Sequence, residues 1–129
     1  MRKQRICVLP CSGMGKALGS VTREIGLIIA EEMRELDAHL VCPSSLTADI
    51  GDYGNAIKRT PTVVIDGCVE KCATKIAAQN GADVIESIFL PKMVGKYRLK
   101  PKGRYDIGSE GRMLAHRVSE DVATVIKKM

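Results

Sequence analysis

Strand, turn and helix follow one another in Val63-Val64-Ile65-Asp66-Gly67-Cys68-Val69-Glu70-Lys71-Cys72, and the rest of the chain can be read outward from this order. The β-branched run at its start predicts a buried strand, and Asp66-Gly67 predicts a turn. A helix is expected to begin at about Cys68. Because Cys72 follows one helical turn later, both thiols are expected on the same face of that helix.

Similar patterns on either side predict three further strands and two further helices. Prolines follow or end the predicted strands, and the helical segments carry apolar residues at every third or fourth position. Ser20 is expected to cap the first helix. The predicted strands are 5–10, 38–42, 62–66 and 83–90, and the predicted helices are 20–36, 68–80 and 109–127. Residues 44–61 and 92–106 are expected to form loops, with one helical turn at most in the first and a short edge strand at most in the second.

This alternation predicts a single α/β domain in which helices flank a parallel sheet of about four strands. The fold class is a three-layer, flavodoxin- or Rossmann-like domain, and the expected strand order is 2-1-3-4. Sheets of this class bind ligands at the carboxyl ends of their strands, where the strand order reverses. The functional residues are therefore sought at that edge.

The composition is that of a globular protein. The chain has 129 residues, of which 45% are apolar and 27% charged, so one domain with one core is expected over residues 1–129. No apolar run approaches the roughly 18 residues of a membrane span, so no membrane association is expected. The apolar run after the basic N-terminus stops at Pro10, which is too short for a signal peptide. We therefore expect a cytoplasmic protein.

The five cysteines carry the main chemical signal. An odd number of cysteines in a reducing compartment is not a disulfide framework and more often indicates metal binding or catalysis. Cys11, Cys42 and Cys68 each follow a predicted strand, and Cys72 lies one helical turn after Cys68. Four thiols are therefore expected at one edge of the sheet, whereas Cys7 lies inside the first strand and is expected in the core.

The same residues resemble those of the DGC-domain family, which is named for its Asp-Gly-Cys motif and for which zinc binding has been suggested. The resemblance rests on Pro10-Cys11-Ser12-Gly13, on Ile65-Asp66-Gly67-Cys68 with Cys72, and on the cysteine between these segments, and it covers most of the chain. It implies a four-cysteine metal site at Cys11, Cys42, Cys68 and Cys72. It implies no particular reaction.

Zinc held by four thiolates would form a closed, tetrahedral site, for which sulfur atoms must approach to roughly 3.8 Å. Cys68 at a helix N-terminus would be stabilised as a thiolate, and the Ser12-Gly13 turn would offer free backbone amides. Asp66 is expected to cap the helix or, with Gly67, to support the metal ligands. We expect zinc at this site. The same four cysteines could also hold an iron–sulfur cluster, and this alternative stays open.

A second hypothesis is a thiol-based enzyme or carrier for sulfur or another thiophilic group, with Cys11 or Cys68 as the working thiolate. No general base is positioned by the sequence, so whether the chain is an enzyme stays open. The glycines of Gly13-Met14-Gly15-Lys16-Ala17-Leu18-Gly19 follow a strand, but the third is one residue late for a dinucleotide fingerprint. Nucleotide binding is therefore a minor alternative.

Charge gathers in one segment of this basic chain, whose net charge is +5. Basic residues concentrate between Lys92 and Arg104. This run is either a solvated loop or a surface for an anion or an acidic protein partner beside the cysteines. One Phe, three Tyr and no Trp give little surface for stacking bases, and no recognition-helix motif is present. Sequence-specific binding of nucleic acid is not expected.

Overall fold

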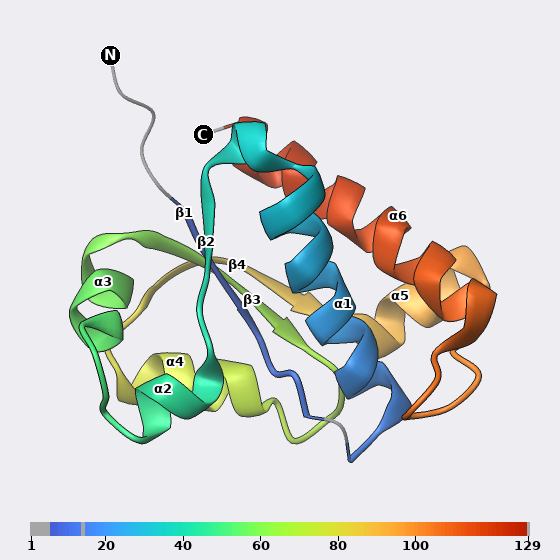
Figure 1. The fold of residues 1–129 in the computed structure, drawn as a ribbon, viewed down its shortest axis with the longest axis horizontal. Coiled ribbons are helices and arrows are strands. Elements are labelled where there is room, and N and C mark those ends of the chain that lie inside the picture. Colours follow the sequence, from blue (N-terminus) through green and yellow to red (C-terminus); the bar gives the residue numbers. More distant parts are fainter. Residues whose placement is uncertain (1–5, 14, 129) are drawn as a thin grey trace.

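Four parallel strands form one sheet in the computed structural model, which describes residues 6–13 and 15–128. The strands lie in the order β2-β1-β3-β4, as predicted, and every neighbouring pair is parallel (Figure 1). Their bounds are β1 Ile6–Pro10, β2 Ala38–Leu40, β3 Pro61–Asp66 and β4 Asp83–Phe89. The order reverses between β1 and β3, so the carboxyl ends of these two strands mark the expected position of a ligand site.

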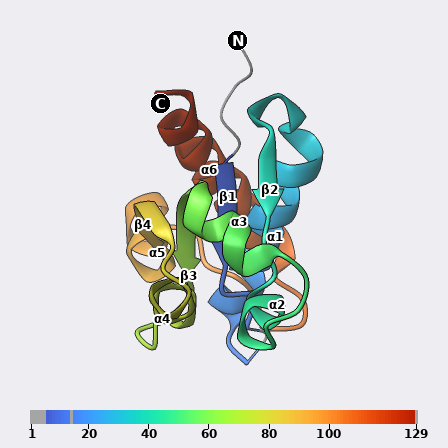
Figure 2. The same cartoon turned by 90° about the vertical axis from the view of Figure 1, so that its left-hand side faces the viewer.

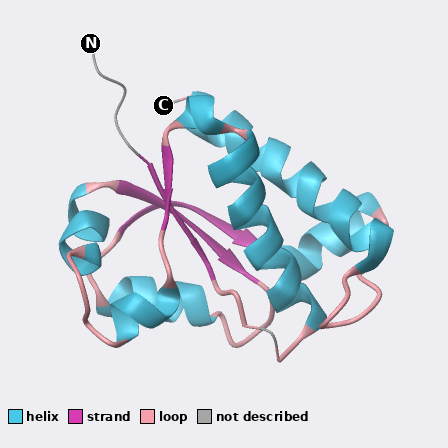
Figure 3. Cartoon of the chain, in the orientation of Figure 1, coloured by secondary structure: helices cyan, strands magenta, loops and turns pink. Residues whose placement is uncertain are grey.

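Helices cover both faces of this sheet, which confirms the three-layer α/β architecture (Figures 2 and 3). α1, α5 and α6 lie on one face, and α2, α3 and α4 lie on the other. Their bounds are α1 Ala17–Glu32, η1 Arg34–Leu36, α2 Pro43–Thr47, α3 Tyr53–Arg59, α4 Cys72–Gln79, α5 Leu90–Tyr97 and α6 Gly108–Lys127. None of these helices in the described part of the chain is both long enough and apolar enough to cross a membrane.

The alternation of side chains along the strands divides the core into two clusters, one on each face. Val8 packs with the residues of α1 and α6, whereas Cys7 and Leu9 pack on the opposite face with α2, α3 and α4. In β3, Val64 likewise faces away from its neighbours Val63 and Ile65. Cys7 is 1% exposed, so the prediction that it is a core residue is confirmed.

The predicted start of the first helix is wrong. α1 begins at Ala17 rather than after Ser20, and Lys16 occupies the cap position without a side-chain hydrogen bond. Ser20 lies in the first turn, where its hydroxyl donates to the carbonyl oxygen of Arg104 at 2.6 Å. A serine that bonds a distant segment cannot be distinguished from a cap by sequence pattern, because both uses place it near the start of an apolar repeat.

Two segments predicted as loops contain helices. Residues 44–61 hold α2 and α3, and the basic run after β4 begins with α5 rather than with an edge strand. Pro43 and Pro91 were interpreted as ends of strands, but each lies in the first turn of a helix. Proline is favoured at that place because its fixed backbone angle suits a helix and its missing N–H is not needed there.

Candidate thiol site at the carboxyl edge of the sheet

The four predicted ligand residues lie at the carboxyl ends of β1, β2 and β3. Cys11 follows β1 directly, and its backbone N–H donates to the carbonyl oxygen of Ile65 in β3 at 2.9 Å. Cys42 follows β2, which ends at the same edge because Val8 of β1 pairs with Leu40 of β2. Cys68 follows β3 after the turn.

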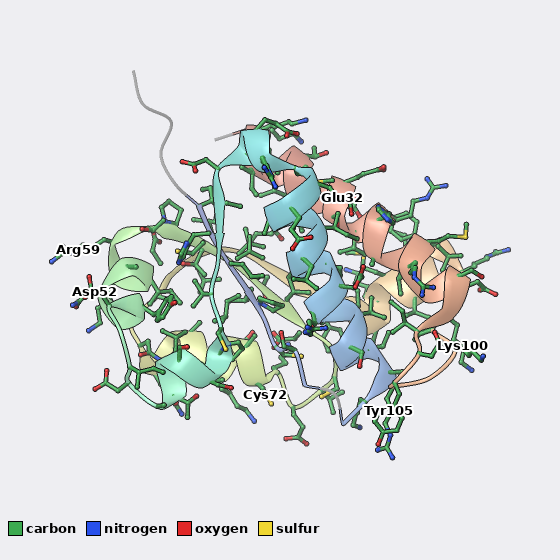
Figure 4. All side chains as sticks on the ribbon, viewed as in Figure 1. Glu32, Asp52, Arg59, Cys72, Lys100 and Tyr105 are labelled. Atoms are coloured by element: carbon green, nitrogen blue, oxygen red, sulfur yellow. The ribbon has the colours of Figure 1, made fainter. Side chains whose placement is uncertain are left out.

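Cys72 is the first residue of α4 and is labelled at this edge in Figure 4. The predicted helix start at Cys68 is therefore wrong by one turn. Cys68 lies in the segment 67–71 that joins β3 to α4, so the two thiols do not share a helix face. Val69, the next residue in this segment, is 77% exposed. The first position of the helix is occupied by Cys72 rather than by Cys68.

Three of these cysteines line one cavity of about 200 Å³, namely Cys11, Cys68 and Cys72. A second cavity of about 520 Å³ is lined by Cys11 and Cys42. Cys11 therefore lies between the other thiols. The first cavity is walled mainly by glycine backbone and by two charged side chains: Gly13, Gly15, Gly19, Gly67, Lys16 and Glu70.

The thiols share these cavities without forming a closed cluster. Across residues 6–13 and 15–128, no three His, Cys, Asp or Glu side chains are close enough together to hold a metal ion. Cys11 and Cys68 are half-buried, Cys42 and Cys72 are exposed, and none of the four forms a disulfide. The donor set thus suits zinc in kind and in location, because soft thiolates are its preferred ligands, but the observed spacing is wider than coordination needs.

Thr22 positions Cys11 and was not found by the sequence analysis. Its buried hydroxyl lies 3.5 Å from the Cys11 sulfur and accepts from the backbone N–H of Ser12 at 3.0 Å. The same hydroxyl donates its one proton to the carbonyl oxygen of Gly19 at 2.6 Å, so the Cys11 thiol is the donor toward it. The available signal was a polar residue next to Val21 on the apolar face of the first helix.

Asp66 caps α4, as predicted, although it stands six residues before the first residue of that helix. Its carboxylate is 1% exposed and accepts from the backbone N–H groups of Ala73 at 3.0 Å and Thr74 at 3.3 Å. It also accepts the hydroxyl of Thr74. The conventional cap position, Lys71, has a φ of +49° and makes no capping bond. Asp66 therefore fixes Cys72 relative to β3.

Gly67 and Gly19 let three chain segments touch behind the cavity. A Cβ atom on Gly67 would lie 2.8 Å from the backbone nitrogen of Gly19, and one on Gly19 would lie 1.7 Å from the carbonyl oxygen of Gly13. These approaches bring the loop of Cys68 against the start of α1 and the start of α1 against the loop of Cys11. Gly19, in the first turn of α1, thus serves backbone packing rather than dinucleotide binding, whereas a Cβ atom on Gly13 or Gly15 would meet open space.

The pKa of the Cys42 thiol lies below its usual value. The largest cause is a hydrogen bond from the backbone of Ser45, which outweighs the cost of partial burial, and Ser44 contributes in the same direction. Cys42 occupies the cap position of α2, so its sulfur lies near the first backbone amides of that helix, although it forms no capping hydrogen bond by geometry. A depressed thiol pKa means that Cys42 carries more thiolate at neutral pH than an ordinary cysteine.

Comparison with known protein families gives a match over most of the chain. The sequence model of a family described as the DGC domain matches residues 7–126, a span that includes all five cysteines. No curated protein and no solved structure matches the chain.

Proposed function

Because this chain belongs to the DGC-domain family, we propose that it binds a zinc ion through the thiolates of Cys11, Cys68 and Cys72, with Cys42 as the fourth ligand. The observation that carries the proposal is the cavity that three thiols line, one from the loop after β1 and two from the connection between β3 and α4. When bound, zinc held by thiolates either stabilises the fold or is carried to a partner protein. Free thiols of this kind persist in a reducing compartment such as the cytoplasm.

Residues 68–71 are the part of the site that can adjust when a metal binds. Cys68 is half-buried, and the three residues after it are exposed. These residues can therefore move while the buried Gly67 stays packed against the backbone of α1. Cys11 and Cys72, by contrast, are held by Thr22 and by the Asp66 cap, respectively. Lys16, which also lines the cavity, offsets part of the negative charge that several thiolates would bring.

The experiment is to measure metal and inorganic sulfide per chain in protein purified without oxygen. About one zinc ion per chain is expected in the natural protein, and the Cys68→Ser variant should lose it. Cys7→Ala is the matched control, because Cys7 lies in the core and lines neither cavity. If iron and inorganic sulfide were found instead, the same cysteines would hold an iron–sulfur cluster rather than zinc. Absence of metal from both the natural protein and Cys7→Ala would overturn the proposal.

One observation favours a second candidate, a thiol-based enzyme or carrier for a thiophilic group. Cys42 is exposed and has a lowered pKa, so it, rather than Cys11 or Cys68, is the residue that suits the working thiolate. Alkylation separates the two functions. A zinc site should protect the cavity thiols until a chelator is added, whereas a thiol enzyme should show one fast-reacting cysteine, Cys42, whether or not a chelator is present.

A further inference from the structure

A cavity of about 500 Å³ opens beside the thiol site, between α1, the segment that precedes α6 and the first turns of α6. Its volume lies within the range of small-molecule sites. Three arginines from these three parts of the chain line it: Arg23 on α1, Arg104 before α6 and Arg112 on α6. Tyr105, also in its wall, is labelled in Figure 4 at the same end of the molecule as Cys72.

The three guanidinium groups form no ion pair with a carboxylate anywhere in residues 6–13 and 15–128. Two acidic residues, Glu24 and Asp106, also line the cavity. Asp106 is already engaged, since it accepts from the backbone N–H of Gly108 at 3.0 Å and lies 3.7 Å from the ammonium of Lys102. The cavity therefore carries a surplus of positive charge on guanidinium groups, which can bind two oxygen atoms of a carboxylate or a phosphate.

The segment that carries Arg104 is held in place before any ligand binds. The Ser20 hydroxyl bonds the Arg104 carbonyl oxygen at 2.6 Å, and the backbone N–H of Lys102 donates to Ile107 at 2.9 Å, which closes the turn. The Arg104 guanidinium lies 4.9 Å from the centre of the Tyr105 ring, a cation–π distance that restrains it further. A preformed site binds more tightly, because less freedom is lost on binding.

The arginine cavity is connected to the thiols. Ser12 and Arg23 line it and also line the neighbouring cavity that contains Cys11 and Cys42. We propose that the three arginines bind the phosphate or carboxylate group of a small molecule, and that the remainder of this molecule extends past Ser12 toward Cys11 and Cys42. This inference goes beyond metal binding, because it assigns a ligand class to side chains that hold no metal.

Binding is tested first with inorganic phosphate, titrated at constant ionic strength and followed through backbone amide NMR signals. Saturable shifts are expected at Ser12 and Arg104, and Arg112→Gln should weaken binding by about tenfold, the effect of one charge-assisted hydrogen bond. Arg117→Gln is the matched control, because Arg117 is an exposed arginine of the same helix that lies outside the cavity. Shifts that never saturate, or equal weakening in both variants, would overturn the proposal. If acetate displaces phosphate from the cavity, the natural ligand is assigned a carboxylate group. If acetate does not displace it, the ligand is assigned a phosphate group.

The connection to the thiols is tested with two reagents of nearly equal size. Iodoacetate and iodoacetamide both alkylate a thiolate, whose sulfur displaces iodide, but only iodoacetate carries a carboxylate. The rate at which iodoacetate modifies Cys42 or Cys11, divided by the rate for iodoacetamide, should be higher in the natural protein than in Arg23→Gln. Phosphate should slow the reaction with iodoacetate but not the reaction with iodoacetamide. Equal ratios of the two rates in the natural protein and in Arg23→Gln would show that the arginine cavity does not direct ligands to these cysteines. Both experiments can be run on metal-free protein, so they are independent of the zinc proposal.

Discussion

Replacing Asp66 by alanine should destabilise the protein by about 2–4 kcal/mol. The carboxylate is buried and accepts from two backbone N–H groups and one hydroxyl. Loss of a helix cap costs about 0.5–2 kcal/mol, and each buried donor left without a partner costs about 1–3 kcal/mol. These costs do not add fully, because Thr74 is only half-buried and water can reach it. The expected loss is therefore smaller than their full sum.

Urea denaturation of the natural protein and of three variants measures this cost. Asp66→Asn keeps one acceptor oxygen and should lose about half as much free energy of unfolding as Asp66→Ala. Asp52→Ala is the matched control, because Asp52 also precedes a helix, α3, but is exposed, and its carboxylate accepts from the side-chain amide of Asn55 at 2.7 Å without capping the helix. Its loss should stay below about 0.5 kcal/mol. If Asp66→Ala lost no more than Asp52→Ala, the remote cap would not hold α4 in place.

Two further predictions concern backbone packing and pH. Gly67→Ala should lower the free energy of unfolding by about 1–3 kcal/mol, because its Cβ would meet backbone rather than a flexible side chain. Gly95→Ala is the control, because a Cβ atom there meets open space in the interior of α5, and it should raise the free energy of unfolding by about 0.5–1 kcal/mol. If urea denaturation showed equal effects of the two substitutions, the close contact at Gly67 would be contradicted. The pKa of Tyr97 is raised because its hydroxyl donates to the Asp121 carboxylate at 2.5 Å. The folded state therefore holds this proton more tightly, and the stabilisation is present below pH about 10 and is lost as the pH rises further. The stability difference between the natural protein and Tyr97→Phe should shrink above that pH, and a difference that stayed constant there would show that Tyr97 does not titrate as described.

The topology and the location of the thiols could be predicted because both depend on local signals. Apolar runs that end in proline or glycine mark the strands, and parallel strands must end at one edge, which placed Cys11, Cys42 and Cys68 there. The start of α4 could not be predicted, because its cap, Asp66, lies outside the usual capping window. Pro91 suits both the end of a strand and the start of a helix, so α5 was missed.

The residues missed at the site act across long separations in sequence. Thr22 contacts a cysteine 11 positions before it, and Arg23, Arg104 and Arg112 meet only through the packing of α1 against α6. No periodicity or motif links such positions in a single sequence. The basic run was predicted as a solvated loop or an anion surface, and only Arg104 of that run lines the arginine cavity.

The three residues of the Asp-Gly-Cys motif have different structural roles. Asp66 holds a helix and Gly67 permits two backbones to touch, so both are tied to the architecture, whereas Cys68 is half-buried and lines the cavity. Position 68 is therefore open to exchange. A histidine or an aspartate there would offer nitrogen or oxygen in place of sulfur on an unchanged backbone. In the zinc site proposed above, one substitution at position 68 should thus change which metal is preferred.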